Sequence, residues 1–185
     1  EQNPIIISDN VIICSNSVLE GPLFIDHHSQ ISPLSLIKGN TSIGPFCKIG
    51  GEVVCHQDST FLYTEPESAV GFWVALEDAT IENGCLQVAS GGHKGPLRKL
   101  FTKENGKMTM KELNKNPFPP TDTILEVKKG TLVLLHGRLP HYSCENKSAK
   151  SRHAYTLHII DGNSIYPKTN WLQRPNLPLK GFIDD

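Results

Sequence analysis

The tripeptide His56-Gln57-Asp58 has the residue types and the spacing of a metal site. In an extended strand, side chains two positions apart lie on the same face, so His56 and Asp58 can point at one ion. One imidazole, one carboxylate and a second histidine from elsewhere in the chain form a triad that binds ferrous iron and leaves coordination positions open. The alternative interpretation is a polar strand end whose histidine has no special role.

The spacing alone does not select which later histidine would complete the triad. Three of the histidines have no partner in a motif, and we predict them to be structural or solvated: His93, His153 and His158.

The elements that must position these residues are short strands separated by turns. Asn83-Gly84 and Lys128-Lys129-Gly130 are turn signals, and residues 98–120 are polar and low in periodicity, which predicts a mobile insertion that could include a short helix. The expected strands are 70–76, 124–127, 131–135 and 154–160. This pattern predicts an all-β fold, an antiparallel sandwich or barrel.

A set of motifs over about residues 50–171 resembles the phytanoyl-CoA dioxygenase family, most closely its phytanoyl-CoA dioxygenase domain-containing branch. The motifs are His56-Gln57-Asp58, Phe61-Leu62-Tyr63, Trp73, Glu82-Asn83-Gly84-Cys85-Leu86, and His141-x-Ser143-x-x-Asn146 followed by Arg152.

This resemblance implies a double-stranded β-helix (jelly-roll or cupin-like) that binds Fe(II) and the cosubstrate 2-oxoglutarate and hydroxylates a small organic or acyl-CoA-type substrate with O2. It assigns the catalytic metal ligands to His56, Asp58 and His141, with His141 preferred to His136 because Ser143 and Asn146 follow it and Arg152 lies 11 residues downstream. It also implies that Arg152 holds the distal carboxylate of 2-oxoglutarate, since a guanidinium offers two parallel donors. The other expected cofactor contacts are Ser143, Trp73 and Gln57.

The chain departs from the family upstream of residue 50. The family has helices, a first barrel strand, and a lysine and a methionine of the cosubstrate pocket in that place, whereas nothing here matches them. We therefore expect a barrel that is incomplete, with an exposed sheet edge. The alternative function is a non-catalytic or truncated barrel that binds metal or 2-oxoglutarate.

A six-residue repeat occupies this upstream stretch. Its period fits neither a helix nor a hairpin, but it fits a β-solenoid in which aliphatic side chains stack inside. The eight repeated positions are Ile7, Ile13, Leu19, Ile25, Ile31, Ile37, Ile43 and Ile49. The pattern resembles a hexapeptide-repeat, left-handed β-helix, which divides the chain into a solenoid segment (1–50) and an oxygenase-like domain (51–185). Some members of that class are acyltransferases; a fragment of one is the third functional hypothesis, with His27 and His28 as the only candidate bases.

Composition narrows the class of partner. The 18 Lys+Arg and 19 Asp+Glu residues give a net charge of −1, which favours a small-molecule substrate over nucleic acid or a membrane surface. No apolar run approaches the 18 residues of a transmembrane helix, and we expect no signal peptide from the first residues. The five cysteines are scattered and odd in number, so they do not predict a disulfide framework. We expect a protein of the cytoplasm or another reducing compartment, oligomeric through its solenoid segment.

Overall fold

A computed structural model describes residues 4–33, 35–44, 47–173, 176 and 181. The chain divides into two compact units, Glu1–Glu52 and Val53–Asp185. Within the described residues the helices are two short 3-10 turns, η1 (Asp58–Thr60) and η2 (Gly92–Lys94), and neither could cross a membrane. The fold is therefore all-β over this part of the chain.

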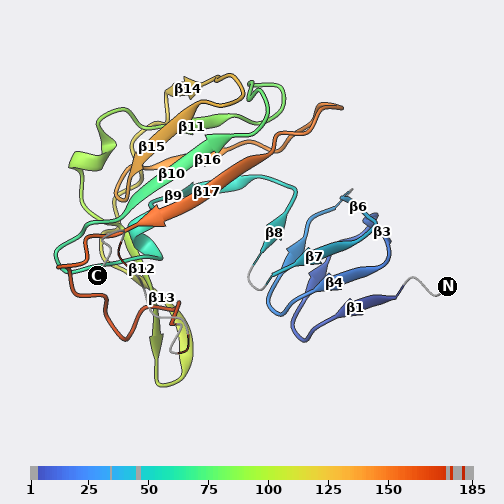
Figure 1. Cartoon of the computed structure of the whole chain (residues 1–185). Helices are drawn as coiled ribbons and strands as arrows, with labels where there is room; N and C mark the ends of the chain where they lie inside the picture. The colour runs from blue at the N-terminus through green and yellow to red at the C-terminus, as the bar shows by residue number, and fades with distance from the viewer. Residues whose placement is uncertain (1–3, 34, 45–46, 174–175, 177–180, 182–185) are drawn as a thin grey trace. The chain divides into compact units, whose positions relative to one another are not determined.

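The first unit consists of short strands that pair in parallel with a constant offset (Figure 1). Ile7 pairs with Ile25 and Ile25 with Ile43, so each coil takes 18 residues, or three of the six-residue repeats. The strands form three sheets, β1-β4-β7, β2-β5-β8 and β3-β6. Their bounds are β1 (Ile5–Ile7), β2 (Ile12–Ile13), β3 (Val18–Glu20), β4 (Leu23–Ile25), β5 (Gln30–Ile31), β6 (Leu36–Lys38), β7 (Thr41–Ile43) and β8 (Lys48–Ile49).

Aliphatic side chains fill the interior of these coils, and small polar residues form the corners. Ile25 and Ile31 are completely buried, because a coil lies on either side of them. At the corners, the Ser29 hydroxyl donates to the Gly44 carbonyl oxygen and accepts from the Cys47 amide. His28 has a positive φ of 57°, so it is a corner residue of the turn.

The second unit contains two antiparallel sheets and a separate hairpin (Figure 1). One sheet has the order β15-β10-β17 and the other β14-β11-β16-β9, while β12 and β13 pair with each other as a two-stranded sheet. The strands are β9 (Val53–His56), β10 (Val70–Ala75), β11 (Leu86–Val88), β12 (Lys99–Glu104), β13 (Lys107–Glu112), β14 (Thr123–Leu125), β15 (Leu132–His136), β16 (His141–Ser143) and β17 (Ala154–Ile159).

The two sheets share one hydrophobic core. Trp73 and Ala75 from β10 and Leu135 from β15 pack with Leu86 and Val88 from β11. These residues alternate with more exposed ones along each strand, as expected for strands with one face in a core. None of the five cysteines forms a disulfide bond in the structure.

The structure corrects the expectation for residues 98–120. This stretch contains no described helix but a regular hairpin, β12–β13, with six paired residues on each strand. Asn105 and Gly106 make its turn, with φ angles of 50° and 80°, a conformation typical of a two-residue hairpin turn. The predicted strands on either side of Lys128–Gly130 do form, but β14 pairs with β11 and β15 with β10, so the turn connects two sheets.

Candidate metal and cosubstrate site

The first two candidate ligands lie where β9 ends and η1 begins. His56 is the last residue of β9 and Asp58 the first residue of η1. Gln57 between them is extended, with φ −121° and ψ 133°, which keeps the flanking side chains on one side of the backbone. The His56 Nε2 atom lies 3.5 Å from the Asp58 Oδ1 atom.

The third candidate comes from β16, the neighbour of β9 in the same sheet. His141 lies opposite His56 in the ladder, and the two rings are 4.3 Å apart between centroids. Its Nε2 atom is 3.6 Å from Asp58 Oδ1. One potential ligand atom from each of the three residues lies within 4.8 Å of the other two, so one ion could contact all three. His136, the other candidate, is not in this group.

Backbone carbonyls orient both imidazoles toward this point. The Nδ1 atom of His56 lies 2.8 Å from the Val54 carbonyl oxygen, and that of His141 lies 2.9 Å from the Leu139 carbonyl oxygen. An Nδ1–H bonded to a carbonyl leaves the Nε2 lone pair free for a metal, a common support for histidine ligands. The donor set of two imidazoles and one carboxylate therefore suits a divalent transition metal such as Fe(II).

Electrostatics favour a charged Asp58 and a neutral His141. Burial opposes ionisation of Asp58, but the neighbouring His158 and His56 imidazoles hold its pKa well below its usual range. Burial lowers the pKa of His141, and the attraction of Asp58 does not compensate. For His56, burial is outweighed by the hydrogen bonds to Asp58 and the Val54 carbonyl, so its pKa is raised. A carboxylate and a neutral imidazole are the forms that bind metal.

Three residues predicted to contact 2-oxoglutarate lie together beside this group. The Arg152 guanidinium carbon is 5.8 Å from the centre of the Trp73 ring, and its Nη2 atom is 3.5 Å from the Ser143 hydroxyl oxygen. Arg152 Nε is buried and has no hydrogen-bond partner among the described residues. Burial lowers the pKa of Arg152, yet a guanidinium remains charged. A half-buried cation whose Nε donor is buried and unused is suited to a carboxylate ligand.

One cavity of about 290 Å³ joins the two groups. Its wall includes side chains from both sheets, so it opens between them. The site residues that line it are His56, Asp58, His141, Trp73, Ser143, Arg152 and His158.

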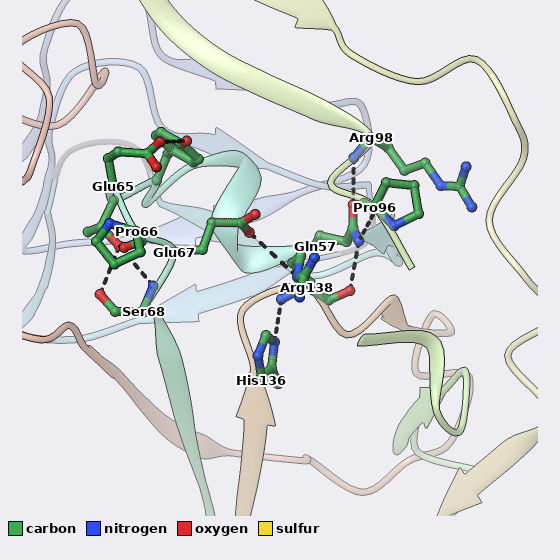
Figure 2. A network of polar contacts seen from close by, with 11 residues as sticks. Gln57, Glu65, Pro66, Glu67, Ser68, Pro96, Arg98, His136 and Arg138 are labelled. Carbon is green, nitrogen blue, oxygen red and sulfur yellow. Dashed lines mark hydrogen bonds and ion pairs between the residues drawn. The ribbon is translucent and has the colours of Figure 1, made fainter. Parts of the chain in front are cut away.

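Gln57 differs from the prediction, because its side chain is used by the protein backbone. Its amide nitrogen donates to the carbonyl oxygens of Arg138 (2.7 Å) and Pro96 (3.2 Å), and its Oε1 accepts from the Arg98 amide (2.9 Å), as Figure 2 shows. It is 1% exposed and is absent from the cavity wall. Gln57 thus connects the turn between the two candidate ligands to the segment that leads into His141.

We expect Gln57→Leu to lower stability rather than remove a cosubstrate contact. The apolar side chain would leave two carbonyls and one amide unpaired, and each buried unpaired group costs about 1–3 kcal/mol. Urea unfolding followed by tryptophan fluorescence measures this, since Trp73 and Trp171 both lie in the second unit. Gln87→Leu on β11 is a control for the same substitution at a less buried position. Unchanged stability with weakened 2-oxoglutarate binding would contradict this role of Gln57.

Sequence reasoning did not predict the position of His158, whereas His136, the competitor that it set aside, lies outside the group of three. His136 lies at the exposed end of β15, where its Nδ1 accepts from the Arg138 amide, and its ring lies 5.3 Å from that of His93 (Figure 2 shows His136 and Arg138). His158, predicted to be structural or solvated, lies in the cavity with its Nε2 3.2 Å from Asp58 Oδ2. The available signal was the alternation along β17, which puts His158 on the same face as Ala154 and Thr156.

A group of two imidazoles and one carboxylate in a sandwich of antiparallel sheets is the arrangement of a non-haem iron oxygenase. The family model of phytanoyl-CoA dioxygenase (PhyH) matches residues 41–154. The chain therefore belongs to the phytanoyl-CoA dioxygenase family.

Curated relatives agree with this assignment. The chain is 44% identical over 131 residues to "Phytanoyl-CoA dioxygenase" of Arabidopsis thaliana, covering 70% of this chain and 46% of the relative. It is 47% identical over 137 residues to "Phytanoyl-CoA dioxygenase domain-containing protein 1 homolog" of Dictyostelium discoideum, covering 68% and 47%. The chain thus spans about half the length of the curated relatives it matches.

Solved structures show the same fold at low identity. The epimerase SnoN, in complex with Fe3+, alpha ketoglutarate and nogalamycin RO, matches with a TM-score of 0.55 and 18% identity over 71% of this chain and 52% of SnoN. The carbocyclase SnoK from nogalamycin biosynthesis matches with a TM-score of 0.52 and 20% identity over 70% and 54%.

Proposed function

We propose that this chain carries the catalytic site of a non-haem Fe(II)- and 2-oxoglutarate-dependent dioxygenase that hydroxylates a small organic substrate. The observation that carries the proposal is the shared cavity, in which the group of three potential metal ligands lies beside a half-buried arginine whose Nε donor is unused. Family membership and the iron- and alpha-ketoglutarate-containing SnoN structure support the same chemistry.

The residues divide this work between metal and cosubstrate. His56, Asp58 and His141 would hold Fe(II) through Nε2, a carboxylate oxygen and Nε2, leaving other coordination positions open for the cosubstrate and O2. Bound iron would supply the oxygen chemistry, and the protein would supply placement. Arg152 and Ser143 would bind the distal carboxylate of 2-oxoglutarate, and Trp73 would wall its pocket.

The substrate is proposed only by class. The family name indicates an acyl-CoA, and a small organic molecule of another kind is the wider class. We place the enzyme in the cytoplasm or another reducing compartment, in keeping with five cysteines that form no disulfide bond. For residues 1–50 we propose a left-handed β-helix of the hexapeptide type, through which the chain would oligomerise; the 18-residue parallel register supports this.

One alternative is a barrel that binds 2-oxoglutarate without turnover. It is supported by the fact that this chain spans only about half the length of the relatives it matches. Incubation with Fe(II), ascorbate, O2 and 2-oxoglutarate distinguishes the two. We expect succinate formation that stops on chelation of iron or omission of 2-oxoglutarate. Tight binding of 2-oxoglutarate without succinate, with a panel of acyl-CoA and free-acid substrates, would favour the alternative.

A further inference from the structure

The two carboxylate oxygens of Asp58 have different neighbours. Oδ1 lies 3.5 Å from His56 Nε2 and 3.6 Å from His141 Nε2, on the side of the proposed metal ligands. Oδ2 is buried, has no partner among the described residues that meets hydrogen-bond geometry, and lies 3.2 Å from the Nε2 atom of His158. The Asp58 side chain is only 8% exposed, so water cannot readily take the place of His158. One oxygen is thus directed to the ligand group and the other to a third histidine.

The fold brings His158 to this place through the pairing of β10 and β17. His158 lies directly opposite Gly71, and cross-strand partners share a face of the sheet. A Cβ atom on Gly71 would lie 2.9 Å from Asp58 Oδ2 and 3.4 Å from the His158 ring. The absence of a side chain at Gly71 therefore provides the space in which the carboxylate and the imidazole meet.

We infer that His158 is a positioning residue, whose Nε2 atom holds Asp58 Oδ2 by a polar contact at 3.2 Å and so presents Oδ1 alone to the metal. This inference rests on the proposed metal site. A carboxylate free to rotate could offer both oxygens to the ion and occupy a position needed by the cosubstrate or O2. His158 is not itself one of the ligands, because its contact is with the oxygen on the far side of the carboxylate. The group of three within 4.8 Å, searched over the described residues, excludes it.

The test uses Co(II) alone as probe, with affinity and the visible d–d spectrum as readouts besides activity. We expect His158→Leu to weaken Co(II) binding about 10- to 100-fold, as for other residues that support metal ligands, and to change the spectrum. His158→Gln keeps a donor at a similar reach and should recover most of the affinity. Gly71→Ala should reproduce the loss, because its methyl group would displace Oδ2.

His153→Leu is the matched control, since the same substitution falls on an exposed histidine just before β17. Thermal unfolding checks that each variant is folded. Wild-type affinity and spectrum in His158→Leu would overturn the inference. A second result would also overturn it: Co(II) affinity that stays low in His158→Gln, together with one fewer nitrogen ligand in the Cu(II) electron paramagnetic resonance spectrum of the His158 variants. That result would make His158 a metal ligand. Failure of the wild-type chain to bind Co(II) would instead contradict the proposed function.

Discussion

His141→Ala is expected to abolish iron-dependent succinate formation and to weaken Co(II) binding by more than about 100-fold, whereas His136→Ala leaves both near wild type. Loss of a partner behind a ligand costs about 10- to 100-fold, and loss of the ligand itself should cost more. The two histidines are only five positions apart in the sequence (141 minus 136). They therefore test the structural placement, in which only His141 lies with His56 and Asp58.

Both readouts are needed because His141 is buried. His141→Gln retains most of the side-chain volume, so a loss of metal in this variant as well excludes collapse of the pocket as the cause. Equilibrium binding of Co(II) and thermal unfolding are measured on the same preparations. The ligand assignment fails should the His141 variants retain metal while His136→Ala loses it.

Arg152→Gln is expected to weaken 2-oxoglutarate binding about 100-fold or more. Removing one partner of a buried, hydrogen-bonded charge pair costs about 2–5 kcal/mol or more, because the other charge stays desolvated. Arg152→Lys should recover little, since a lysine offers no pair of parallel donors and does not stack on Trp73 in the same way. Calorimetric titration of Mn(II)-loaded protein with 2-oxoglutarate measures binding without turnover.

Lys150→Gln provides the control for the Arg152 variants. Lys150 is exposed and lies two positions before Arg152 in the sequence, and its replacement by Gln removes one positive charge, as Arg152→Gln does. Its effect on affinity should be small, because an exposed charge acts through solvent. Equal weakening by Lys150→Gln and Arg152→Gln would indicate a general effect of net charge and would contradict a specific carboxylate contact.

Sequence patterns predicted local features well because these depend on nearby residues. The strand at residues 70–76, the last strand at 154–160 and the Asn83-Gly84 turn all form. The hairpin β12–β13 was missed although Asn105-Gly106 is a hairpin signal. Its strands are mostly exposed, so they lack the alternation of apolar and polar residues that marks a half-buried strand.

Longer-range features could not be obtained from pattern alone. The partner of each strand depends on packing, so nothing local showed that β14 and β15 enter different sheets. The orientation of the Gln57 side chain depends on hydrogen bonds to backbone carbonyls 39 and 81 positions away in the sequence. His158 belongs to no linear motif, and its approach to Asp58 depends on the β10–β17 register across Gly71.

The pairing of β9 with β16 has a consequence for the stability of the sheet. Within the described residues, β9 is an edge strand held by one neighbour, and it carries His56 opposite His141. An ion bound to both would act as a cross-link that closes a loop of 85 residues (141 minus 56) and ties down this edge. At a free metal concentration of about 100 Kd, such a ligand stabilises the folded state by about 2.7 kcal/mol. Metal depletion would then abolish activity and also weaken the attachment of β9 to its sheet. The unpaired backbone of such an edge strand is a template for aggregation.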